Sequence, residues 1–559
     1  MLPGILPGDD TLAYSIANRS ACLYYMGDIK RCLADIEFAL ASGYPDQLQY
    51  KLFERRAKCF VHLKQFDKAK AAWSKAKQNL DIHKAKMDEK KLSQAGKSLK
   101  DLMSCISKQK GLEDEVIVVE DEQVPVQPKL TKGSSKKMPD LSNLVKVEHN
   151  EAVGRHVVAG KHIKAGDTLA IEEPFAAVLY PDKLGSNCTN CFVKLRAAVP
   201  CPGCAGVGFC SVACRDEACS SFHKYECKYQ DLIQGLGTSA LAKLAYRIVA
   251  SQSLKFFNNI KHHLNVDEKR SEIEALALHY SIPGVSKSTY LSYLRLFNLV
   301  GLDNMRWQED LFNRALMSVC LLKILKHAQY FPNKSDQDSF TNDECFIGSL
   351  IMRHMNVLQF NAHEIYEFFR GDRARMKPFK NNLIGVGVYP QASYFNHSCH
   401  PGTTRYNIGK KLVLKSLTPL QPGQEVSENY GQVFYFKTKK ERQKELSGRY
   451  WFSCECRACK EDWPLLKENT KVCWKAEKNE SALDDLKTIF DCGSDFMEHG
   501  QTKDAVESLT EYIDEVYTLV DPPLETVIRA EDKLRTCFND MGTVLFQDTA
   551  LKTNPQEKR

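Results

Sequence analysis

Long apolar stretches and a strong charge of either sign are both missing from this sequence. No apolar run approaches the roughly 18 residues of a membrane-spanning helix, and no signal peptide opens the chain. The 77 basic and 70 acidic side chains leave a formal net charge of only +7 over 559 residues, too small an excess to require nucleic acid as a partner. We therefore expect a protein of the cytoplasm and nucleus that has no membrane partner and meets nucleic acid only indirectly.

The overall composition is that of a globular protein. Hydrophobic residues make up 43% of the chain and charged residues 26%, which are ordinary proportions. Because a domain usually holds roughly 100–200 residues, the length predicts several domains. About half of the 21 cysteines gather in two places where their spacing indicates metal binding.

Eight of the cysteine and histidine residues within 188–227 stand in the spacings C-x2-C, C-x2-C, C-x3-C and H-x3-C. Eight ligands fill two tetrahedral zinc sites and leave no open position for water, so we predict two structural zinc ions. A disulfide scaffold is the alternative, but it is typical of short secreted chains. The eight candidate ligands are Cys188, Cys191, Cys201, Cys204, Cys210, Cys214, His223 and Cys227.

The first 110 residues carry an internal repeat of helical type. Positions 37 residues apart hold similar side chains, as Ile36 and Trp73 do, and small residues recur at Ala39 and Ala76. Small residues at this spacing let paired helices approach closely, while the large ones fill the groove between them. The pattern resembles tetratricopeptide repeats, with three residues beyond the usual period of about 34 placed in an extended turn at 42–45.

Three polar residues of these repeats form a candidate peptide site. Asn18 and Arg55 are 37 residues apart, and Lys51 lies one helical turn before Arg55, so all three face one groove. The set resembles the carboxylate clamp with which tetratricopeptide domains hold the C-terminal tails of chaperones, because an amide and two cations suit a terminal carboxylate. A solvated charged face is the competing interpretation, and the sequence does not decide between them.

Residues 111–142 read as a linker, since an acidic stretch at 113–122 is followed by prolines and a short basic cluster. Alternating apolar residues then predict short strands within 145–158 and 167–178, joined by a turn at 164–167. Amphipathic runs such as 272–279 and 312–330 predict helices from 231 to about 368, and strands return from 383.

Two later motifs carry a family resemblance. Asn396-His397-Ser398-Cys399, followed by Glu428-Asn429-Tyr430, resembles the core of a SET-domain lysine methyltransferase, and the cysteine-rich segment resembles a MYND finger. Their order in the chain is similar to that of the SET-and-MYND family, in its long branch with N-terminal tetratricopeptide repeats. The implied fold class is α+β multidomain: a split, β-rich SET core with an inserted MYND zinc finger, flanked by N- and C-terminal α-helical repeat domains.

The resemblance implies a division of the chain into eight segments. In chain order these are helical repeats at 1–110, a linker at 111–142, the N-terminal part of SET at 143–186, the MYND finger at 187–228, a helical SET insert at 229–375, core SET at 376–436, a post-SET zinc segment at 437–463 and a C-terminal helical domain at 464–559. For the last segment, the placement of Phe496, Gly500 and Ala505 echoes the turn and small residue of the first repeats.

A third zinc ion is implied near the later motif. Cys454, Cys456 and Cys459 form a C-x-C-x2-C run that is one thiolate short of a tetrahedral site. In the family a zinc ion of this kind fixes the post-SET segment over the active site, with Cys399 as its fourth ligand. Such an ion would hold the aromatic residues at 450–452 near Asn396 and Tyr430, and three free cysteines on a loop are the alternative.

The function implied by the resemblance is transfer of a methyl group from S-adenosylmethionine to lysine side chains of histone or non-histone proteins. Tyr430 would be the catalytic tyrosine, which orients the neutral amine, and a narrow apolar channel would favour loss of the lysine proton. His363 and Tyr450 would line that channel. The cofactor would contact Gly154, Arg155, His156, Asn361, Asn396, His397, Tyr430 and Phe452.

Two departures from the family pattern bear on activity. The turn reads Gly154-Arg155-His156, where many SET domains have glycine at both ends, and His363 stands where relatives often have a channel phenylalanine. A titratable imidazole beside the target amine would change substrate choice or turnover. The alternative function is a non-catalytic transcription- or chaperone-linked scaffold that binds proline-containing peptides through the MYND finger and chaperone tails through the repeats.

Overall fold

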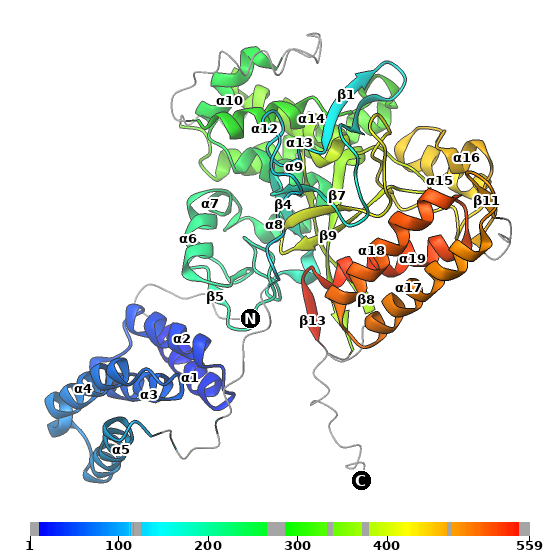
Figure 1. Ribbon diagram of the computed structural model, residues 1–559. Helices are drawn as coiled ribbons and strands as arrows, with labels where there is room; N and C mark the ends of the chain where they lie inside the picture. Colours follow the sequence, from blue (N-terminus) through cyan, green and yellow to red (C-terminus); the bar gives the residue numbers. More distant parts are fainter. Residues whose placement is uncertain are drawn as a thin grey trace, which may run out of the picture. The chain divides into compact units, whose positions relative to one another are not determined.

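The computed structural model describes residues 11–110, 112, 116, 125–264, 285–332, 339–371, 379–466 and 472–546. The chain divides into two compact units, Met1–Val124 with Pro202–Ala205, and Pro125–Cys201 with Gly206–Arg559. Figure 1 shows the smaller unit as helices and the larger as a mixture of strands and helices. Among the described helices, none is both long and apolar enough to cross a membrane.

The described part of the smaller unit is built from helical hairpins. The helices α1 and α2 form one hairpin and α3 and α4 another, and α5 packs on α3 and α4. As the repeat predicts, the small residues Cys32, Ala39, Ala69 and Ala76 are completely buried between helices. The helices are α1 (Thr11–Tyr25), α2 (Ile29–Ala41), α3 (Gln49–His62), α4 (Phe66–His83) and α5 (Glu89–Ser107).

The larger unit is organised around small sheets. A three-stranded sheet has the order β3-β10-β9, a four-stranded sheet has the order β13-β7-β8-β4, and β1 pairs with β2. All these pairs are antiparallel except β13 with β7. The strands are β1 (Val145–Asn150), β2 (Gly154–Ala159), β3 (Thr168–Glu172), β4 (Ala176–Leu179), β7 (Ala362–Arg370), β8 (Phe379–Val388), β9 (Thr403–Ile408), β10 (Lys411–Ser416) and β13 (Val544–Phe546).

The strands predicted within 145–158 and 167–178 are therefore present, and a turn joins them at 164–167, where the Asp167 amide donates to the Lys164 carbonyl at 3.2 Å. The cysteine-rich segment follows β4. It contains β5 (Val199–Pro200), β6 (Gly208–Phe209), α6 (Val212–Ser220) and α7 (His223–Glu226). The chain thus leaves the sheet after β4 and returns to it only with β7 and β8.

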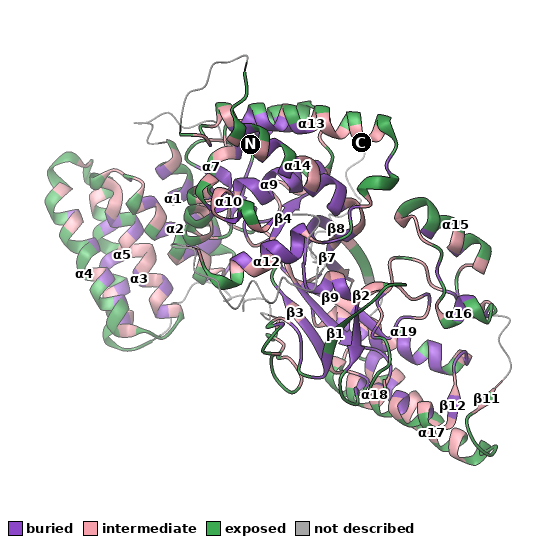
Figure 2. Cartoon of the chain, turned by 90° about the horizontal axis from the view of Figure 1, so that it is seen from above, coloured by how far each residue is buried: buried purple, intermediate pink, exposed green. Residues whose placement is uncertain are grey.

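Helices cover the sheets. The buried helix α9 packs on β4 and β8, and α14 packs on α9; Figure 2 shows α9 and the strands β3 and β9 as largely buried. The helices of this region are α8 (Gln230–Gly235), α9 (Ala240–Ala250), α10 (Leu254–Ile260), α12 (Lys287–Phe297), α13 (Gln308–His327) and α14 (Asn342–Asn361). The run at 272–279 lies outside the described residues.

One sequence prediction is wrong here: helix does not continue to about 368. Strand β7 begins at Ala362, so strands return well before residue 383. The inward-facing positions of β7 include His363 and Glu367, which are 8% and 0% exposed. Polar residues at buried positions hide the apolar alternation by which a strand is predicted.

The C-terminal helices pack against the three-stranded sheet. A shared core joins Leu509, Ile513 and Leu534 of these helices to Tyr406 and Val413 of the sheet. Gly500 separates α17 from α18 and Ala505 is completely buried, as the placement of these residues predicts. The elements are α15 (Lys439–Tyr450), α16 (Arg457–Lys460), β11 (Cys473–Trp474), α17 (Glu480–Glu498), α18 (Thr502–Leu519), β12 (Val520–Asp521) and α19 (Glu525–Asp540).

Candidate functional site

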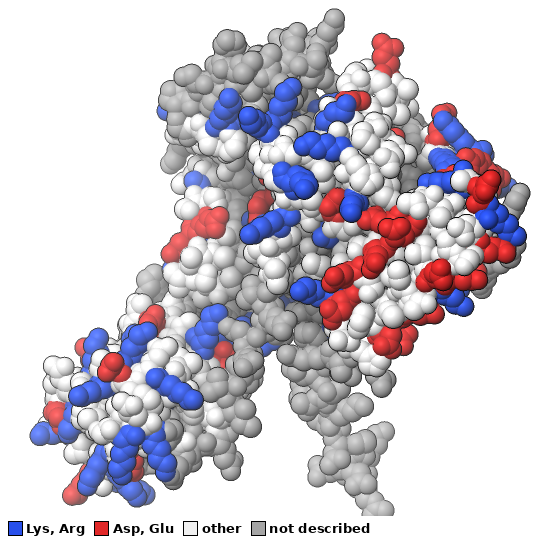
Figure 3. Space-filling model, in the orientation of Figure 1, with Lys and Arg blue, Asp and Glu red and all other residues white. Residues whose placement is uncertain are grey.

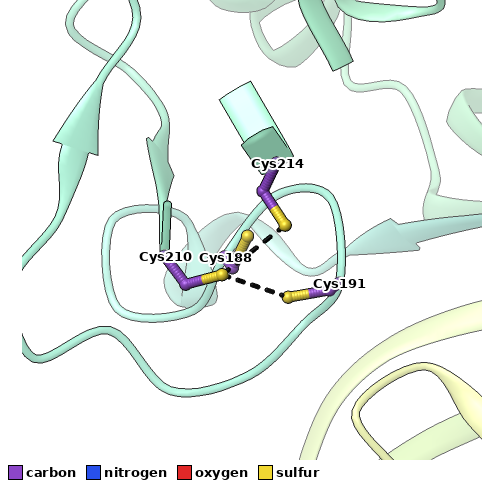
Figure 4. Close-up of side chains that lie close together, drawn as sticks. All are labelled: Cys188, Cys191, Cys210 and Cys214. Atoms are coloured by element: carbon purple, nitrogen blue, oxygen red, sulfur yellow. Dashed lines mark hydrogen bonds between the residues drawn. The ribbon is translucent and has the colours of Figure 1, made fainter. Parts of the chain in front are cut away.

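The first and third cysteine pairs of the cysteine-rich segment come together in one cluster. In Figure 4 the thiols of Cys188, Cys191, Cys210 and Cys214 point toward one another. The Cys210 sulfur lies 3.5 Å from those of Cys191 and Cys214. Four thiol groups at this separation have the donor set and spacing of a tetrahedral, all-cysteine zinc site.

The second and fourth pairs form another cluster. Cys201, Cys204, His223 and Cys227 place their ligand atoms within 4.8 Å of one another. The Cys201 sulfur lies 3.3 Å from Nε2 of His223 and 3.6 Å from the sulfur of Cys227. This set of three thiols and one imidazole fits zinc equally well. The sequence predicts eight ligands but not which pairs share a site. In the structure the first pair joins the third and the second joins the fourth, so each site spans much of the segment.

The cysteine-rich segment is tied to the sheet through the turn between β9 and β10. Gly409 has a φ of +57° there, and an added Cβ would lie 2.5 Å from the carbonyl oxygen of Cys191. Only glycine allows this backbone conformation and this close approach together. Glu226, next to Cys227, is completely buried, and it receives a 2.7 Å hydrogen bond from Arg247 of α9.

The third cluster unites residues that are far apart in sequence. Cys399 lies beside Cys454, Cys456 and Cys459, and their ligand atoms are all within 4.8 Å of one another. The sulfurs of Cys399 and Cys459 are 3.5 Å apart, and both residues are buried. The fourth ligand suggested by the resemblance is therefore in place for a second all-cysteine site.

Two residues of α15 that the sequence did not single out position the third cluster. Arg442 is completely buried and donates to the carbonyl of Ala458 at 3.3 Å and to the Cys459 sulfur at 3.5 Å. Gln443 makes a matched pair of bonds with the backbone of Cys454, donating to its carbonyl at 2.6 Å and accepting from its amide at 2.9 Å. A charged residue and an amide in a polar helix give no sequence signal of this role.

The two motifs lie side by side. The amide of Glu428 donates to the carbonyl of Asn396, and the amide of Ser398 donates to the carbonyl of Glu428, both at 2.8 Å. Nδ1 of His397 accepts a 3.0 Å hydrogen bond from the amide of Tyr430. Backbone pairing of two segments about thirty residues apart thus brings Asn396, His397 and Tyr430 into one site.

The Tyr430 side chain is held by its hydroxyl and by its ring. Its hydroxyl donates to the carbonyl of Phe395 at 3.1 Å, and its ring centroid lies 5.3 Å from that of His397. Burial raises the pKa of the hydroxyl above its usual value, so Tyr430 stays protonated at neutral pH. Burial likewise lowers the pKa of His397 to about 4, which keeps the imidazole neutral.

Aromatic residues after α15 cover this pair. The Tyr450 ring lies 5.1 Å from that of Tyr430, and its hydroxyl donates to the Tyr430 carbonyl at 3.4 Å. The Phe452 ring lies 6.1 Å from His397 and 6.4 Å from Tyr450. Trp451 between them adopts a left-handed conformation, with φ of +62°, and packs on Phe360. The predicted proximity of residues 450–452 to the motifs is therefore present.

The turn at Gly154 reaches the same site. Nδ2 of Asn396 lies 3.5 Å from the carbonyl of Val153, and Gly154 has a φ of +68°. An added Cβ at Gly154 would meet nothing within 4 Å, so space is open beside its backbone. The Nδ1 of His156 bonds to the Gly154 carbonyl at 3.1 Å, so this ring stabilises the turn.

Arg155 is engaged within the protein. Its guanidinium donates to the Tyr394 hydroxyl at 2.9 Å and to the Asn298 carbonyl at 2.5 Å, and it stacks over the Tyr394 ring. Asn361 is similar, since its amide nitrogen donates to the carbonyls of Val300 and Val357 at 2.8 and 2.7 Å. Any cofactor contact of Asn361 therefore falls to its side-chain oxygen or its backbone.

His363 belongs to a buried polar network. Its Nε2 lies 3.8 Å from a carboxylate oxygen of Glu428, and Glu428 also pairs with Arg405. Glu428 is only 2% exposed and stands two residues before Tyr430. Burial, with the charge of Arg405, lowers the pKa of His363 to about 3, so the imidazole is neutral at physiological pH. The roles of Glu428 and Arg405 could not be identified from the sequence, because a buried charged pair has no sequence signature.

The three predicted clamp residues lie on α1 and α3 of the smaller unit. Asn18 and Lys51 are exposed. Arg55 is instead half-buried and donates to the Ala17 carbonyl at 3.1 Å and to the Ser20 hydroxyl at 2.7 Å. Arg55 therefore links α3 to α1, whatever else it binds.

Comparison with known proteins gives consistent matches. A family model described as the SET domain matches residues 154–431. Protein-lysine N-methyltransferase SMYD4 of Homo sapiens is 26% identical over 522 residues, which is 81% of this chain and 63% of that protein. The SMYD4 of Danio rerio is 24% identical over 533 residues, 84% of this chain and 63% of that protein. The chain thus spans about 63% of the length of these relatives.

Other relatives match a smaller part of the chain. A SET and MYND domain-containing protein of Dictyostelium discoideum is 23% identical over 376 residues, 56% of this chain and 80% of that protein. Among solved structures, the crystal structure of the SET domain of LSMT bound to lysine and AdoHcy aligns with 64% of this chain and 61% of its own, at 15% identity and a TM-score of 0.21. The SET match and these relatives make the chain similar to the SET-and-MYND domain family over most of its length.

Proposed function

We propose that this chain is a protein-lysine N-methyltransferase that uses S-adenosylmethionine. The observation that carries the proposal is the convergence of Asn396, His397 and Tyr430 with Tyr450 and Phe452, from three separate segments, around the Tyr430 side chain. Relatives named protein-lysine N-methyltransferase support the same activity. The substrates are histone or non-histone proteins that present a target lysine.

The residues present fit the cofactor. Open space beside the backbone at Gly154 leaves room for close approach, and the half-buried Asn396 and Phe452 add a polar group and an aromatic face. When bound, S-adenosylmethionine supplies the methyl group on its sulfonium. In this proposal, Gly154, Arg155 and His156 hold the methionine part, Asn396 and His397 hold the adenosine part, and Phe452 covers the adenine. Asn361 also contacts the cofactor.

Positioning is the main contribution of the protein to this reaction, because methyl transfer to an amine is an in-line displacement. Tyr430 positions the substrate amine with its hydroxyl. This hydroxyl stays protonated and is oriented by its hydrogen bond to the Phe395 carbonyl. Tyr450 and His363 line the lysine channel. A neutral His363 adds no positive charge beside the substrate amine, so the departure from phenylalanine is compatible with activity.

The proposal extends to the metal sites, domains, location and partners of the protein. Three structural zinc ions occupy the three cysteine clusters, whose donor sets support them. The segment at 187–228 is a MYND finger inserted between the two parts of the SET core, and helical repeats of tetratricopeptide type flank that core. The protein works in the cytoplasm and nucleus, and its helical repeats and finger bind chaperone tails or proline-containing peptides.

Transfer of a labelled methyl group to proteins of a cell extract tests the activity. Zinc-replete wild type should label one or more proteins, and Tyr430→Phe should reduce labelling by about 100-fold or more, since one positioned donor contributes about that much. The variant must keep cofactor affinity and thermal stability near those of wild type. Labelling that is unchanged in Tyr430→Phe would remove this tyrosine from the mechanism.

A scaffold acting through its finger and repeats is the second candidate. It is favoured by the engagement of Arg155 with Tyr394 and Asn298, which leaves fewer of its donors for a cofactor. Folded, zinc-replete protein that binds no S-adenosylmethionine would make the scaffold the better interpretation. Its partners would then be sought with chaperone tail peptides and proline-containing peptides.

A further inference from the structure

The smaller unit holds a groove that the functions proposed above do not use. It lies between α4 and α5, where a cavity of about 480 Å³ is lined by residues of both helices, among them Trp73, Lys77, Gly96, Leu99, Lys100 and Met103. A second hollow of about 560 Å³ shares Trp73 and Lys77 and extends along α4 to Ile82. The clamp candidates Asn18, Lys51 and Arg55 line neither of them.

The floor of the groove is apolar and firmly held. The indole nitrogen of Trp73 donates to the Leu99 carbonyl at 2.7 Å, which fixes the ring between the two helices. Leu99 is 1% exposed and Met103 is half-buried, while Ile82 at the far end is 65% exposed. A fixed aromatic face beside flexible methionine is a favourable seat for apolar side chains.

The rim of the groove is basic. Residues 66–107 contain ten lysines and five acidic side chains, and Figure 3 shows lysine and arginine side chains gathered over α4 and α5 at the lower left. Lys77 pairs with Asp81, one turn along the same helix, at 2.9 Å. Lys100 is exposed, and it makes no ion pair among the residues that the structure describes.

Local packing does not explain why residue 96 is glycine. It stands in the middle of α5, where glycine is less favourable than alanine, yet an added Cβ would meet nothing within 4 Å. Close packing within the unit therefore does not require glycine. A side chain at this position would instead enter the groove, so glycine keeps the groove open.

We propose that this groove binds an acidic amphipathic helix of a partner protein. A helix fits because the groove is bounded by two helices, whose ridges can receive the side chains of a third. Apolar residues one turn apart on the partner would seat on Trp73, Leu99 and Met103. Carboxylates on both sides of that apolar seam would pair with Lys77 and Lys100, whose charge disfavours basic partners.

The chain itself contains a segment with the same chemistry as the proposed partner helix, and this segment would compete for the groove. Its own stretch at 113–122 combines acidic residues with the apolar run at 116–119, and it follows α5 closely in sequence. Binding of this stretch would fill the groove from within the chain and leave no site for a partner. The experiment must therefore separate the two occupants.

A labelled 18-residue peptide with a leucine seam and glutamate flanks is the probe, and fluorescence anisotropy with the full-length chain is the readout. Two control peptides replace the glutamates with lysine or the leucines with serine. We expect the acidic peptide to bind at least tenfold more tightly than either control. Its affinity should fall with added salt, because the rim contacts are exposed.

Variants of the groove complete the test. Gly96→Phe fills the groove and should weaken binding at least tenfold, while the matched Gly96→Ala should bind as wild type does. Lys77→Glu with Lys100→Glu should weaken binding by a similar factor, and Lys64→Glu, at an exposed residue that lines neither hollow, should have no effect. If Gly96→Phe does not fold, which circular dichroism would reveal, the charge-reversal pair decides the outcome.

Three results would overturn the proposal. The first is equal affinity for the acidic and lysine-substituted peptides, and the second is binding that survives both groove variants. The third is binding that appears only after residues 113–122 are deleted, which would assign the groove to the chain's own linker.

Discussion

Tyr430 and His397 owe their positions mainly to backbone groups. The Tyr430 hydroxyl bonds to the Phe395 carbonyl, and the His397 ring accepts from the Tyr430 amide. Side-chain substitutions elsewhere can therefore leave this pair in place, as long as the two motif segments stay paired. This makes Tyr430→Phe a clean substitution, since it removes one hydroxyl and leaves the ring contacts with His397 and Tyr450.

His363 should make the fold sensitive to acid. Its pKa is lowered by burial to about 3 in the folded protein, against about 6.5 when unfolded. Between these values the unfolded chain binds a proton that the folded chain does not, so the free energy of unfolding falls as pH drops from 6.5 toward 3. Replacing His363 with phenylalanine should reduce the loss between pH 6.5 and 5.0 by about 1–2 kcal/mol.

Urea unfolding at the two pH values, with zinc present, measures this difference. His354 provides the internal control, because burial lowers its pKa to about 3 as well and it remains in the variant. The variant should therefore keep part of the acid sensitivity. An identical loss of stability in wild type and His363→Phe would show that the imidazole is accessible to protons in the folded state.

At the scale of residues, sequence predicts the candidate metal ligands best. Cysteine and histidine at ligand spacing have few other uses, so Cys188 to Cys227 could be recognised as a set. Glu428, Arg405 and Arg442 could not, because their roles depend on burial and on partners distant in sequence. The interleaving of the cysteine pairs also follows from the path of the chain and not from spacing.

Helix α15 is the element that joins the third cluster to the candidate active site. It begins with a capping box at Thr438 and Glu441, holds the cluster through Arg442 and Gln443, and ends at Tyr450. A metal ion in the third cluster would thus fix residues 450–452 from both sides, through α15 before them and through Cys454 after them. Loss of that ion should disturb Tyr450 and Phe452 before it disturbs the sheets.

Replacing Cys456 with serine tests this coupling. Zinc content should fall from three ions per chain to two, and S-adenosylmethionine binding should weaken by at least tenfold as the aromatic cover loosens. Elemental analysis and calorimetry measure the two effects. The matched control is Cys492→Ser, which alters an exposed cysteine outside the clusters and should change neither. Loss of zinc with unchanged cofactor affinity would uncouple the cluster from the site.

At the scale of elements, strands and helices with regular apolar spacing were predictable, and β7 was not. The hairpins α1–α4 and the strands β1–β4 follow the periodicities of their sequences. In β7, by contrast, Glu367 is completely buried and is satisfied by the amides of Asn187 and Asn382. Such compensation comes from tertiary structure, which a local pattern does not contain.

The molecule as a whole is expected to respond to metal removal in one of its two units. Within the described residues 11–110, no group of metal-type side chains forms a cluster, whereas three clusters lie along the rest of the chain. Chelation should therefore lower the calorimetric transition of the larger unit, which holds every cluster ligand except Cys204, and leave that of the helices α1–α5 unchanged. Equal shifts in both transitions, or a single shared transition, would contradict this expectation.

Binding of S-adenosylmethionine to the zinc-replete, full-length chain is the most direct test of the account. Isothermal titration calorimetry should give one site per chain, with an affinity that falls at least tenfold in Phe452→Ala, because that ring is proposed to cover the adenine. Circular dichroism and zinc content must match between the two proteins. Saturable binding lost with Phe452 is the predicted result, and a folded, zinc-replete protein that binds no cofactor would contradict the proposed methyltransferase.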